Sequence, residues 1–474
     1  MVFSSVIFLF YFLPATLGVY FIVKKELRNA VLLLASLFFY AWGEPKFIVV
    51  LIVSIFINYL VGIGIHAFRE SGKAKWIMVI GVFVNLFILF FYKYIDFTIS
   101  IFNHISLKII PGYGAISPLG IALPIGLSFF TFQGLSYVID VYKNTVPVQK
   151  NPLHIALYIS MFPQLVAGPI VRYIDIAPEI VSRESKLEDV SAGLRRFIIG
   201  LSKKVMVADI LASVSDQIFN MPLEQLTASV AWLGIICYTF QIFFDFSGYS
   251  DMAIGLGRIF GFRFMENFNL PYISCSVSEF WRRWHISLST WFRDYLYIPM
   301  GGNRKGNVYL HLLIVFFCTG LWHGAALTFI VWGLWHGTFL VLERVGRLKG
   351  YKVPFPRWVC WGYTGFVVII GWVLFRSRDL VYAAGFFRAM CGICSPDFKY
   401  MGLAYYLDKQ IIFTLMAAAI VSIGIPGKIM NFLQNKQWGH LWEHLKMYVY
   451  WFLLLCCMTM IVNGNYSPFI YFRF

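Results

Sequence analysis

Two near-copies of one hexapeptide place histidines inside a strongly apolar stretch of the chain. They read Gly-Leu-Trp-His-Gly-Ala at Gly320–Ala325 and Gly-Leu-Trp-His-Gly-Thr at Gly333–Thr338. An ionisable side chain at membrane depth is costly unless it faces protein or a water-filled cavity, so it is a functional candidate by default. Imidazole also titrates near neutral pH, which suits it to moving protons. His323 and His336 are therefore candidates for proton transfer, although each could equally serve to hydrogen-bond a neighbouring helix.

The arrangement of the two hexapeptides depends on whether one helix runs through both. On a continuous helix at about 1.5 Å per residue, His323 and His336 would lie roughly 20 Å apart on different faces and could not act as one unit. A break at Gly320 or Gly324 would change that geometry. We expect the flanking glycines to open the backbone for the close approach of a substrate.

A second segment, Ser278–Arg293, mixes aromatic and cationic side chains around another histidine. On one helix, Trp281 would lie beside His285 at i, i+4, and Ser278, Arg282 and His285 would share a face. The cations expected to form one patch near a membrane surface are Arg282, Arg283, Arg293, Arg304 and Lys305. Such a patch could bind a phosphorylated or carboxylated substrate. Anchoring of an interfacial helix by Trp and Arg at the lipid headgroups is the equally weighted alternative.

Polar side chains also interrupt an apolar run at Phe244–Asp251. Asp245 and Asp251 would lie about 240° apart on a helix, so we expect no shared carboxylate dyad. A capping or helix-breaking role is one interpretation of this segment. The other is that Asp245 faces a cavity and orients a histidine or a substrate group.

Several other chemistries lack their motifs. The chain has no Walker A loop, no HExxH and no G-x-S-x-G. The spacing of His285, His323 and His336 matches no familiar metal-binding set, and Cys391 with Cys394 has no second pair or nearby histidine. We therefore expect no bound metal. Most of the eight cysteines lie in apolar segments and are expected to be small core residues.

The composition is that of a polytopic membrane protein. Of 474 residues, 59% are hydrophobic and only 13% are charged. At about 20 apolar residues per span, the length allows about ten to twelve crossings, and we expect about 11 transmembrane helices in an all-α fold. The net charge of +16 lies in short loops, which indicates positive-inside topology and contact with anionic lipids rather than nucleic acid.

Apolar blocks locate the expected helices. The first four lie at about 1–23, 29–43, 47–65 and 76–97, and the first is expected to be a retained span rather than a signal peptide. Basic residues follow the first and third spans and place the N-terminus outside: Lys24, Lys25 and Arg28, then Arg69, Lys73 and Lys75. Later blocks lie at about 117–142, 152–170, 228–257, 308–322, 325–343, 358–376, 408–425 and 447–464.

Two regions are expected to hold interfacial or re-entrant helices, because charges mix with apolar residues at 172–226 and 276–306. Pro and Gly interrupt Leu123–Gly134 and Phe162–Ile170 in the same way. Together these features predict a cavity that reaches into the bilayer. We expect one integral-membrane domain, 1–474, with N-terminal helices over 1–115, a catalytic core over 116–345 and C-terminal helices over 346–474.

Five strings in this order resemble the membrane-bound O-acyltransferase family: LPIGLSFFTFQ, FPQLVAGPI, FFDFSGYSDMAIG, FWRRWHISLSTWFRDYLYIPMGG and GLWHGAALTFIVWGLWHG. With the opening FSSVIFLFYFLP, they are most similar to its bacterial alginate O-acetylation branch. The resemblance runs from near residue 3 to about 375. It implies tilted outer helices around a thin core, where a cytoplasmic donor entrance and an extracytoplasmic funnel meet near a buried histidine. That histidine corresponds to His323, and His285 corresponds to a supporting polar position, whereas no catalytic role is carried onto His336.

The resemblance further implies an enzyme of the bacterial cytoplasmic membrane that moves acetyl from cytoplasmic acetyl-CoA toward an exported polysaccharide, with His323 as general base. It implies no bound cofactor, and an extracytoplasmic SGNH-type acetyltransferase as partner. His285 or Trp322 would position donor or acceptor, and Arg282, Arg283, Arg304 and Lys305 would hold CoA phosphates. Further expected substrate-binding residues are Gln133, Asp245, Ser247, Tyr249, Trp281 and Trp284. The alternatives are D-alanyl transfer to teichoic acid, a lipid or protein acceptor, and a non-enzymatic polysaccharide or acyl transporter subunit.

Overall fold

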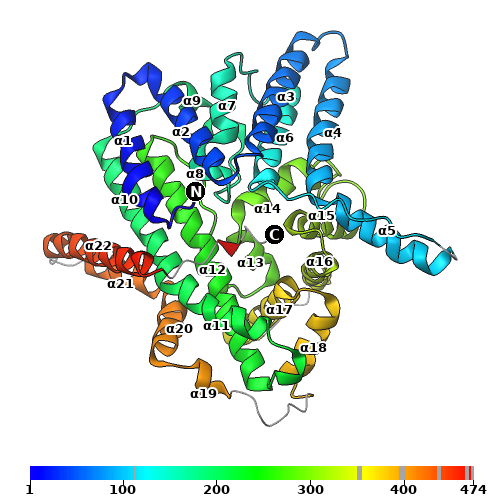
Figure 1. Cartoon of the computed structure of the whole chain (residues 1–474), viewed down its shortest axis with the longest axis vertical. Coiled ribbons are helices and arrows are strands. Elements are labelled where there is room, and N and C mark those ends of the chain that lie inside the picture. The colour runs from blue at the N-terminus through cyan, green and yellow to red at the C-terminus, as the bar shows by residue number, and fades with distance from the viewer. Residues whose placement is uncertain (111–112, 350–354, 394–401, 435–438, 465–468, 471–474) are drawn as a thin grey trace. The chain divides into compact units, whose positions relative to one another are not determined.

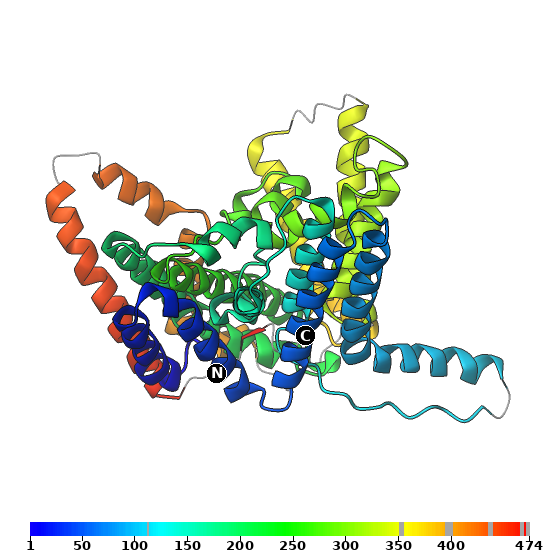
Figure 2. The ribbon, with the colours of Figure 1, turned by 90° about the horizontal axis from the view of Figure 1, so that it is seen from above.

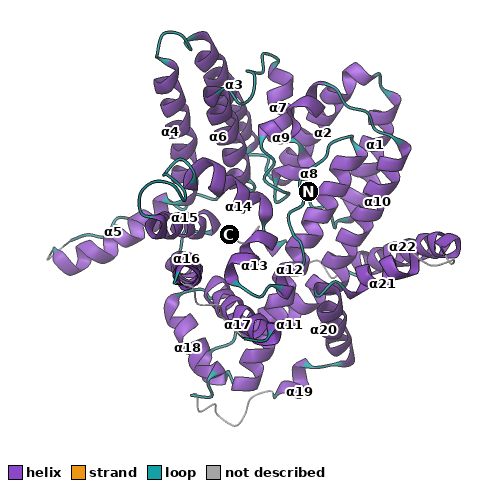
Figure 3. Cartoon of the chain, turned by 180° about the vertical axis from the view of Figure 1, so that it is seen from behind, coloured by secondary structure: helices purple, strands orange, loops and turns teal. Residues whose placement is uncertain are grey.

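The fold was analysed in a computed structural model of the chain, which describes residues 1–110, 113–349, 355–393, 402–434, 439–464 and 469–470. The regular structure over these ranges is helical, with no strand among them (Figure 3). The all-α fold class is therefore confirmed. The chain forms two compact units, one of residues 1–193 and 256–265 and the other of residues 194–255 and 266–474. Gln133 belongs to the first unit and all the other candidate site residues to the second.

The first unit contains the N-terminal helices (Figure 1). They are η1 Phe8–Phe12, α1 Leu13–Ile22, η2 Lys25–Leu27, α2 Arg28–Gly43, α3 Ile48–Ala67, α4 Ala74–Lys93, α5 Ile95–Ile109, α6 Leu127–Lys143, α7 Pro152–Ser160, α8 Phe162–Leu165 and α9 Tyr173–Val181. Helices α3, α4 and α6 lie side by side. Asn58 and Asn85 exchange amide hydrogen bonds of 3.1 and 3.0 Å between α3 and α4. Because both amides are buried, this reciprocal pair satisfies groups that would otherwise be costly in an apolar environment.

Two apolar blocks of the first unit are not single helices. The block expected at 117–142 becomes helical only at Leu127, and the chain before it runs back beside α5 (Figure 2). There the backbone N–H groups of Leu119 and Gly120 donate to Asp96, which holds this stretch away from a helical path. The block at 152–170 divides into α7 and α8 around Met161, as its Pro-rich and Gly-rich string suggests.

The second unit contains the remaining helices. They are η3 Lys203–Ala208, α11 Asp209–Phe219, η4 Leu223–Gln225, η5 Pro271–Ile273, α13 Val277–Arg283, α14 Ile286–Phe292, η6 Arg293–Tyr297, α15 Val308–His323, α16 Leu327–Leu348, α17 Arg357–Arg376, α18 Leu380–Met390, α19 Leu403–Tyr406, α20 Lys409–Ser422, α21 Ile425–Gln434 and α22 Gly439–Val462. Two further helices, α10 Leu187–Ser202 and α12 Ala228–Ile259, contribute residues to both units.

The apolar helices agree with a multi-pass membrane protein. Five segments of the described chain are long and apolar enough to cross a bilayer: Ile48–Ala67, Ala74–Lys93, Ala228–Ile259, Arg357–Arg376 and Leu445–Val462. Four shorter apolar helices are Phe8–Ile22, Val308–His323, Leu380–Met390 and Lys409–Ser422. The mixed region 276–306 forms short helices, among them α13 and α14, whereas in 172–226 the elements α10, η3 and α11 follow one another without a break from Leu187 to Phe219. The count of about 11 spans, the cavity into the bilayer and the outside N-terminus stay predictions.

Candidate active site

The doubled hexapeptide forms a helical hairpin. Helix α15 ends at His323, Gly324 is extended with φ −167°, and α16 begins at Leu327. The continuous helix is therefore wrong, and the alternative of a break at Gly324 is confirmed. The two helices pack closely against each other.

The glycine that begins each hexapeptide serves this packing. A Cβ atom on Gly320 would lie 2.3 Å from the carbonyl oxygen of Phe329, and one on Gly333 would lie 2.2 Å from that of Phe316. No side chain fits there, so these glycines allow two backbones to meet, as small residues do in membrane helix pairs. The expectation that they open the backbone toward a substrate is wrong for these two positions.

His323 is buried at the end of α15, with 4% of its surface exposed. Its ring centroid lies 4.9 Å from those of Trp322 and Trp332 and 5.1 Å from that of Phe375, each in an edge-on arrangement. The three rings come from α15, α16 and α17. Aromatic walls of this kind fix the orientation of an imidazole and exclude bulk water from it.

His336 lies on α16, one turn after Trp332, and is fully buried. Its ring centroid is 5.3 Å from that of Trp332 and 5.2 Å from that of Trp281. A Cβ atom on Gly371 would lie 2.6 Å from its Nε2. Neither of its ring nitrogens has a hydrogen-bond partner among the residues that the structure describes. Trp332 thus separates His336 from His323.

His285 occupies a turn rather than a helix. Helix α13 ends at Arg283, and His285 adopts the left-handed conformation (φ 46°, ψ 54°) before α14 begins. The predicted shared face of Ser278, Arg282 and His285 is therefore wrong, and Trp281 is not its i, i+4 neighbour on one helix. Asn267 holds the turn, since its Oδ1 accepts from the N–H and the hydroxyl of Ser287 and lies 3.2 Å from His285 Nδ1. No motif pointed to Asn267.

Trp322 brings the two candidate histidines into one cluster. The His285 ring centroid is 5.8 Å from that of Trp322, which is 4.9 Å from that of His323. The ring centroid of Phe246 lies 4.6 Å from that of His285, in a T-shaped arrangement. The structure thus brings His285 next to Trp322 and His323, which lie 37 and 38 residues later in the sequence.

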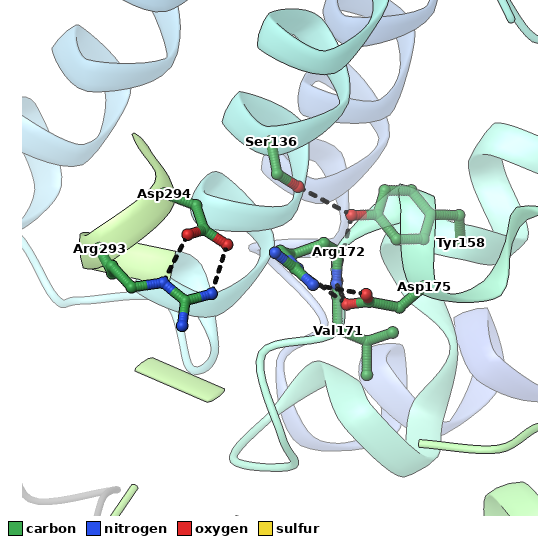
Figure 4. A network of polar contacts seen from close by, with 7 residues as sticks. All are labelled: Ser136, Tyr158, Val171, Arg172, Asp175, Arg293 and Asp294. Carbon is green, nitrogen blue, oxygen red and sulfur yellow. Dashed lines mark hydrogen bonds and ion pairs between the residues drawn. The ribbon is translucent and has the colours of Figure 1, made fainter. Parts of the chain in front are cut away.

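A cavity of about 340 Å³ opens one helical turn before His323. Trp281 and Phe316 line it with Thr319, and the guanidinium-bearing residues Arg282 and Arg293 lie on its wall. Arg282 Nε donates to the carbonyl of Ser278, and Arg293 forms an ion pair of 2.7 Å with Asp294 (Figure 4). The cavity therefore combines aromatic and cationic surfaces.

Of the cations in the predicted patch, only Arg282 and Arg293 line this cavity. Arg283 forms an ion pair of 2.8 Å with Glu279 and donates to the carbonyl of Asn269, so it stabilises the α13 turn. Arg304 and Lys305 are exposed in the loop before α15, outside the set that lines the cavity. Trp284 is buried, with its ring 5.5 Å from that of Phe280 and 4.9 Å from that of Trp372.

Asp245 belongs to a buried ionic cluster. Helix α12 runs through Asp245 and Asp251 to Ile259, so a helix-breaking role is wrong. Lys204 Nζ lies 2.9 Å from Asp245 and 2.6 Å from Asp209, and Asp245 also accepts the backbone N–H of Ile470. Burial raises the pKa of Asp209 to about 7, while Lys204 opposes this rise and Asp245 adds to it. Asp245 is thus directed toward Lys204 rather than toward a histidine.

The other polar residues of the segment Phe244–Asp251 are also buried or form ion pairs within the protein. Asp251 pairs with Lys203 at 2.6 Å and with Arg196 at 2.8 Å, so the two aspartates do not share a site, as expected. Ser247 and Tyr249 are buried, and the Tyr249 ring lies 4.7 Å from that of Phe469.

Gln133 lies on α6 in the first unit and is buried. Its backbone carbonyl accepts from the hydroxyls of Ser136 and Tyr158, and Tyr158 also donates to the carbonyl of Val171 (Figure 4). This network joins α6 and α7. Cys391 is exposed, whereas Cys394 lies outside the described residues.

Comparison with known proteins decides the family. The sequence profile of the membrane-bound O-acyltransferase family matches residues 147–382. The chain is 40% identical over its whole length to a probable alginate O-acetylase of Pseudomonas putida, all of which is covered. The chain belongs to the membrane-bound O-acyltransferase family. It is thus an enzyme of the acyltransferase class, and His285, Trp322 and His323 all lie in the part that the profile matches.

Two further relatives are similar to this acyltransferase. A probable alginate O-acetylase of Pseudomonas aeruginosa is 45% identical over 82% of this chain and 75% of that protein. A peptidoglycan O-acetyltransferase of Helicobacter pylori is 34% identical over 100% of this chain and 98% of that protein. The acyltransferase belongs to the branch that contains the alginate O-acetylases.

Proposed function

We propose that this acyltransferase takes acetyl from acetyl-CoA at the cytoplasmic face and delivers it toward an exported polysaccharide. Relatives that match its full length are named as O-acetylating enzymes of alginate and of peptidoglycan. Both of those acceptors are glycans, which supports a polysaccharide rather than a lipid or a protein as acceptor. We place the enzyme in the bacterial cytoplasmic membrane with its N-terminus outside, because the basic loops then face the cytoplasm.

His323 acts as general base in this proposal. It removes the proton from the acceptor hydroxyl while that oxygen attacks the thioester carbonyl, and the tetrahedral intermediate then expels the CoA thiolate, which takes the proton from the imidazolium. General base catalysis is typically worth about 10² to 10⁴ in rate. The observation that carries this role is the position of His323, held by three aromatic rings one turn beyond the cavity wall at Thr319.

The cavity beside Trp281 is the proposed donor site. Arg282 and Arg293 on its wall supply planar guanidinium groups that suit the phosphates of CoA. Trp281 and Phe316 supply apolar surface for the rest of the donor. Arg304 and Lys305, in the exposed loop before α15, add positive charge to attract the donor from the cytoplasm.

His285 and Trp322 are positioning residues in this proposal. The Trp322 ring packs against both histidines, so it would help to position the base relative to a second polar group. A separate extracytoplasmic SGNH-type acetyltransferase would complete the transfer to the polymer.

The test uses the full-length protein in lipid nanodiscs with radiolabelled acetyl-CoA, a soluble SGNH-type partner and alginate. We expect His323→Gln to lower acetyl incorporation at least a hundredfold. His104→Gln is the control, because His104 is an exposed histidine of α5 and should leave the rate unchanged. Unchanged incorporation by a folded His323→Gln protein would refute the base assignment. Use of a D-alanyl donor in place of acetyl-CoA would instead support D-alanyl transfer.

A further inference from the structure

A second cavity, of about 540 Å³, lies in the second unit between α12, η5, α13, α17 and α20. Its walls are mostly hydrocarbon and aromatic, with Phe240, Pro271, Phe280, Phe366, Val368 and Ile369 among them. Two of the helices that form it, α12 and α17, are long and apolar enough to cross a membrane. We call this cavity the α17 groove.

The polar groups that line the α17 groove are already satisfied by the protein backbone. The hydroxyls of Thr239, Thr364, Ser274, Ser422 and Tyr272 all donate to backbone carbonyls, at 2.5 to 3.0 Å. The indole N–H of Trp361 donates to the carbonyl of Tyr272. These groups therefore offer a ligand no free donor, and the groove suits a hydrocarbon chain.

The surface of α17 leaves room for such a chain. A Cβ atom added to Gly362 or Gly365 would meet nothing within 4 Å. Trp361 and Phe366 on either side are 51% and 56% exposed. The two glycines thus form a shallow strip between large apolar side chains on a membrane-spanning helix.

Positive charge gathers at one end of the groove. Arg357 begins α17 and lies one turn before Trp361, on the same face of the helix. Cys275 Sγ lies 3.8 Å from the carbonyl oxygen of Arg357. Gly424 packs against Leu270 of the same short segment, 270–275, and Lys428 follows one turn later. Both cations are exposed, and neither forms an ion pair with a residue in the described ranges.

The sequence around this end is also basic. Between Glu343 and Arg357 the chain carries Arg344, Arg347, Lys349 and Lys352. By the positive-inside rule this end lies at the cytoplasmic leaflet, whose anionic lipids attract basic juxtamembrane segments.

We propose that the α17 groove is a binding site for an anionic phospholipid of the cytoplasmic leaflet. One acyl chain lies along Gly362 and Gly365, and the headgroup phosphate lies between Arg357 and Lys428. This site does not depend on the proposed acetyl transfer. It adjoins the active site, because Phe280 on its wall also packs against Trp281 and Trp284.

The test is photolabelling of the full-length protein in nanodiscs with a phosphatidylglycerol that carries a diazirine in its acyl chain. We expect the label on the peptide that contains Gly362 to Ile369, with several-fold less from the matching phosphatidylcholine. Gly365→Leu should lower this labelling several-fold. Gly346→Leu is the matched control, because a Cβ on Gly346 also meets nothing within 4 Å but points into open space on α16.

Two further measurements separate the chain from the headgroup. The double variant Arg357→Gln, Lys428→Gln should remove the preference for phosphatidylglycerol while the peptide is still labelled. Unlabelled phosphatidylglycerol should compete with the probe on the wild-type protein, which requires no variant. If neither Gly365→Leu nor competition reduces the labelling of α17, the α17 groove is not a lipid-binding site. If both lipids label α17 equally, the site does not recognise an anionic headgroup.

Discussion

The buried cation Lys204 offers a sharp test of the interior of the second unit. Its side chain is 4% exposed and contacts two carboxylates, Asp209 and Asp245, whose side chains are 9% and 3% exposed. Replacement by Met keeps an unbranched apolar side chain, one atom shorter than that of Lys, but leaves both acids without their shared cation. Removing one partner of a buried ion pair costs about 3 to 5 kcal/mol, because the remaining charge stays buried. We therefore expect Lys204→Met to lower the free energy of unfolding by about that amount.

Lys203→Met is the matched control. Lys203 is the adjacent residue, its side chain is 23% exposed, and its partner Asp251 keeps the guanidinium of Arg196 at 2.8 Å. The expected loss is about 1 kcal/mol or less, as for partly exposed pairs. A difference of about 3 kcal/mol between the two variants corresponds to more than a hundredfold in the ratio of folded to unfolded protein.

The assay is equilibrium unfolding in mixed micelles, followed by tryptophan fluorescence. A triple variant, Lys204→Met with Asp209→Asn and Asp245→Asn, should recover most of the lost stability, because no unpaired charge remains. The reasoning fails if Lys204→Met is no less stable than Lys203→Met. It also fails if neutralising both acids in the Lys204→Met background brings no recovery.

Three further outcomes follow from the structure. Gly320→Ala and Gly333→Ala should each lower the free energy of unfolding by about 1 to 3 kcal/mol, because the added methyl group overpacks the helix contact. Gly346→Ala on the same hairpin should leave the free energy of unfolding unchanged or raise it by up to about 1 kcal/mol. Equal effects of all three substitutions would contradict the close contact between the two helices. The pKa of Asp209 is higher in the folded than in the unfolded state, so the folded state binds more protons between about pH 4 and pH 7. The stability of the protein should therefore fall as the pH rises through that range. Asp209→Asn should weaken the dependence of the melting temperature on pH over the same range, and an unchanged dependence would refute the raised pKa. The acetyl-transfer rate per folded molecule should be higher for His285→Asn than for His285→Ala, because Asn tolerates the left-handed backbone at φ 46°. The reverse order of rates would contradict the positioning role of His285.

Much of the helical framework was predictable from the sequence. Apolar blocks at 228–257, 308–322 and 358–376 are helices within a few residues of the predicted bounds. Long apolar runs must be helical in a bilayer, because their backbone groups have no other partners there. The prediction of a helix over 117–142 was only partly right, because the backbone N–H groups of Leu119 and Gly120 donate to Asp96 instead of forming helical hydrogen bonds. Asp96 lies more than 20 residues earlier in the chain, so no local pattern reveals this contact.

Other features could be decided only by the fold. The i, i+4 pattern around His285 assumed one helix, but Asn267, which lies earlier in the chain, holds a left-handed turn there. The partner of Asp245 is Lys204, on a different helix, and nothing in the spacing of the aspartates indicates it. Ion pairs and turn-stabilising bonds between distant segments depend on which helices pack together, whereas periodicity reports only local neighbours.

The sequence alone determined the all-α membrane fold and the family, and it singled out the candidate histidines, because hydrophobicity, motif order and residue type are properties of short segments. Only the tertiary structure decided that Gly324 breaks the doubled motif, that Gly320 and Gly333 allow two backbones to meet, and that Trp322 packs against both His285 and His323. Those outcomes depend on close packing between segments far apart in the chain, where a single Cβ atom is enough to change which surfaces can meet.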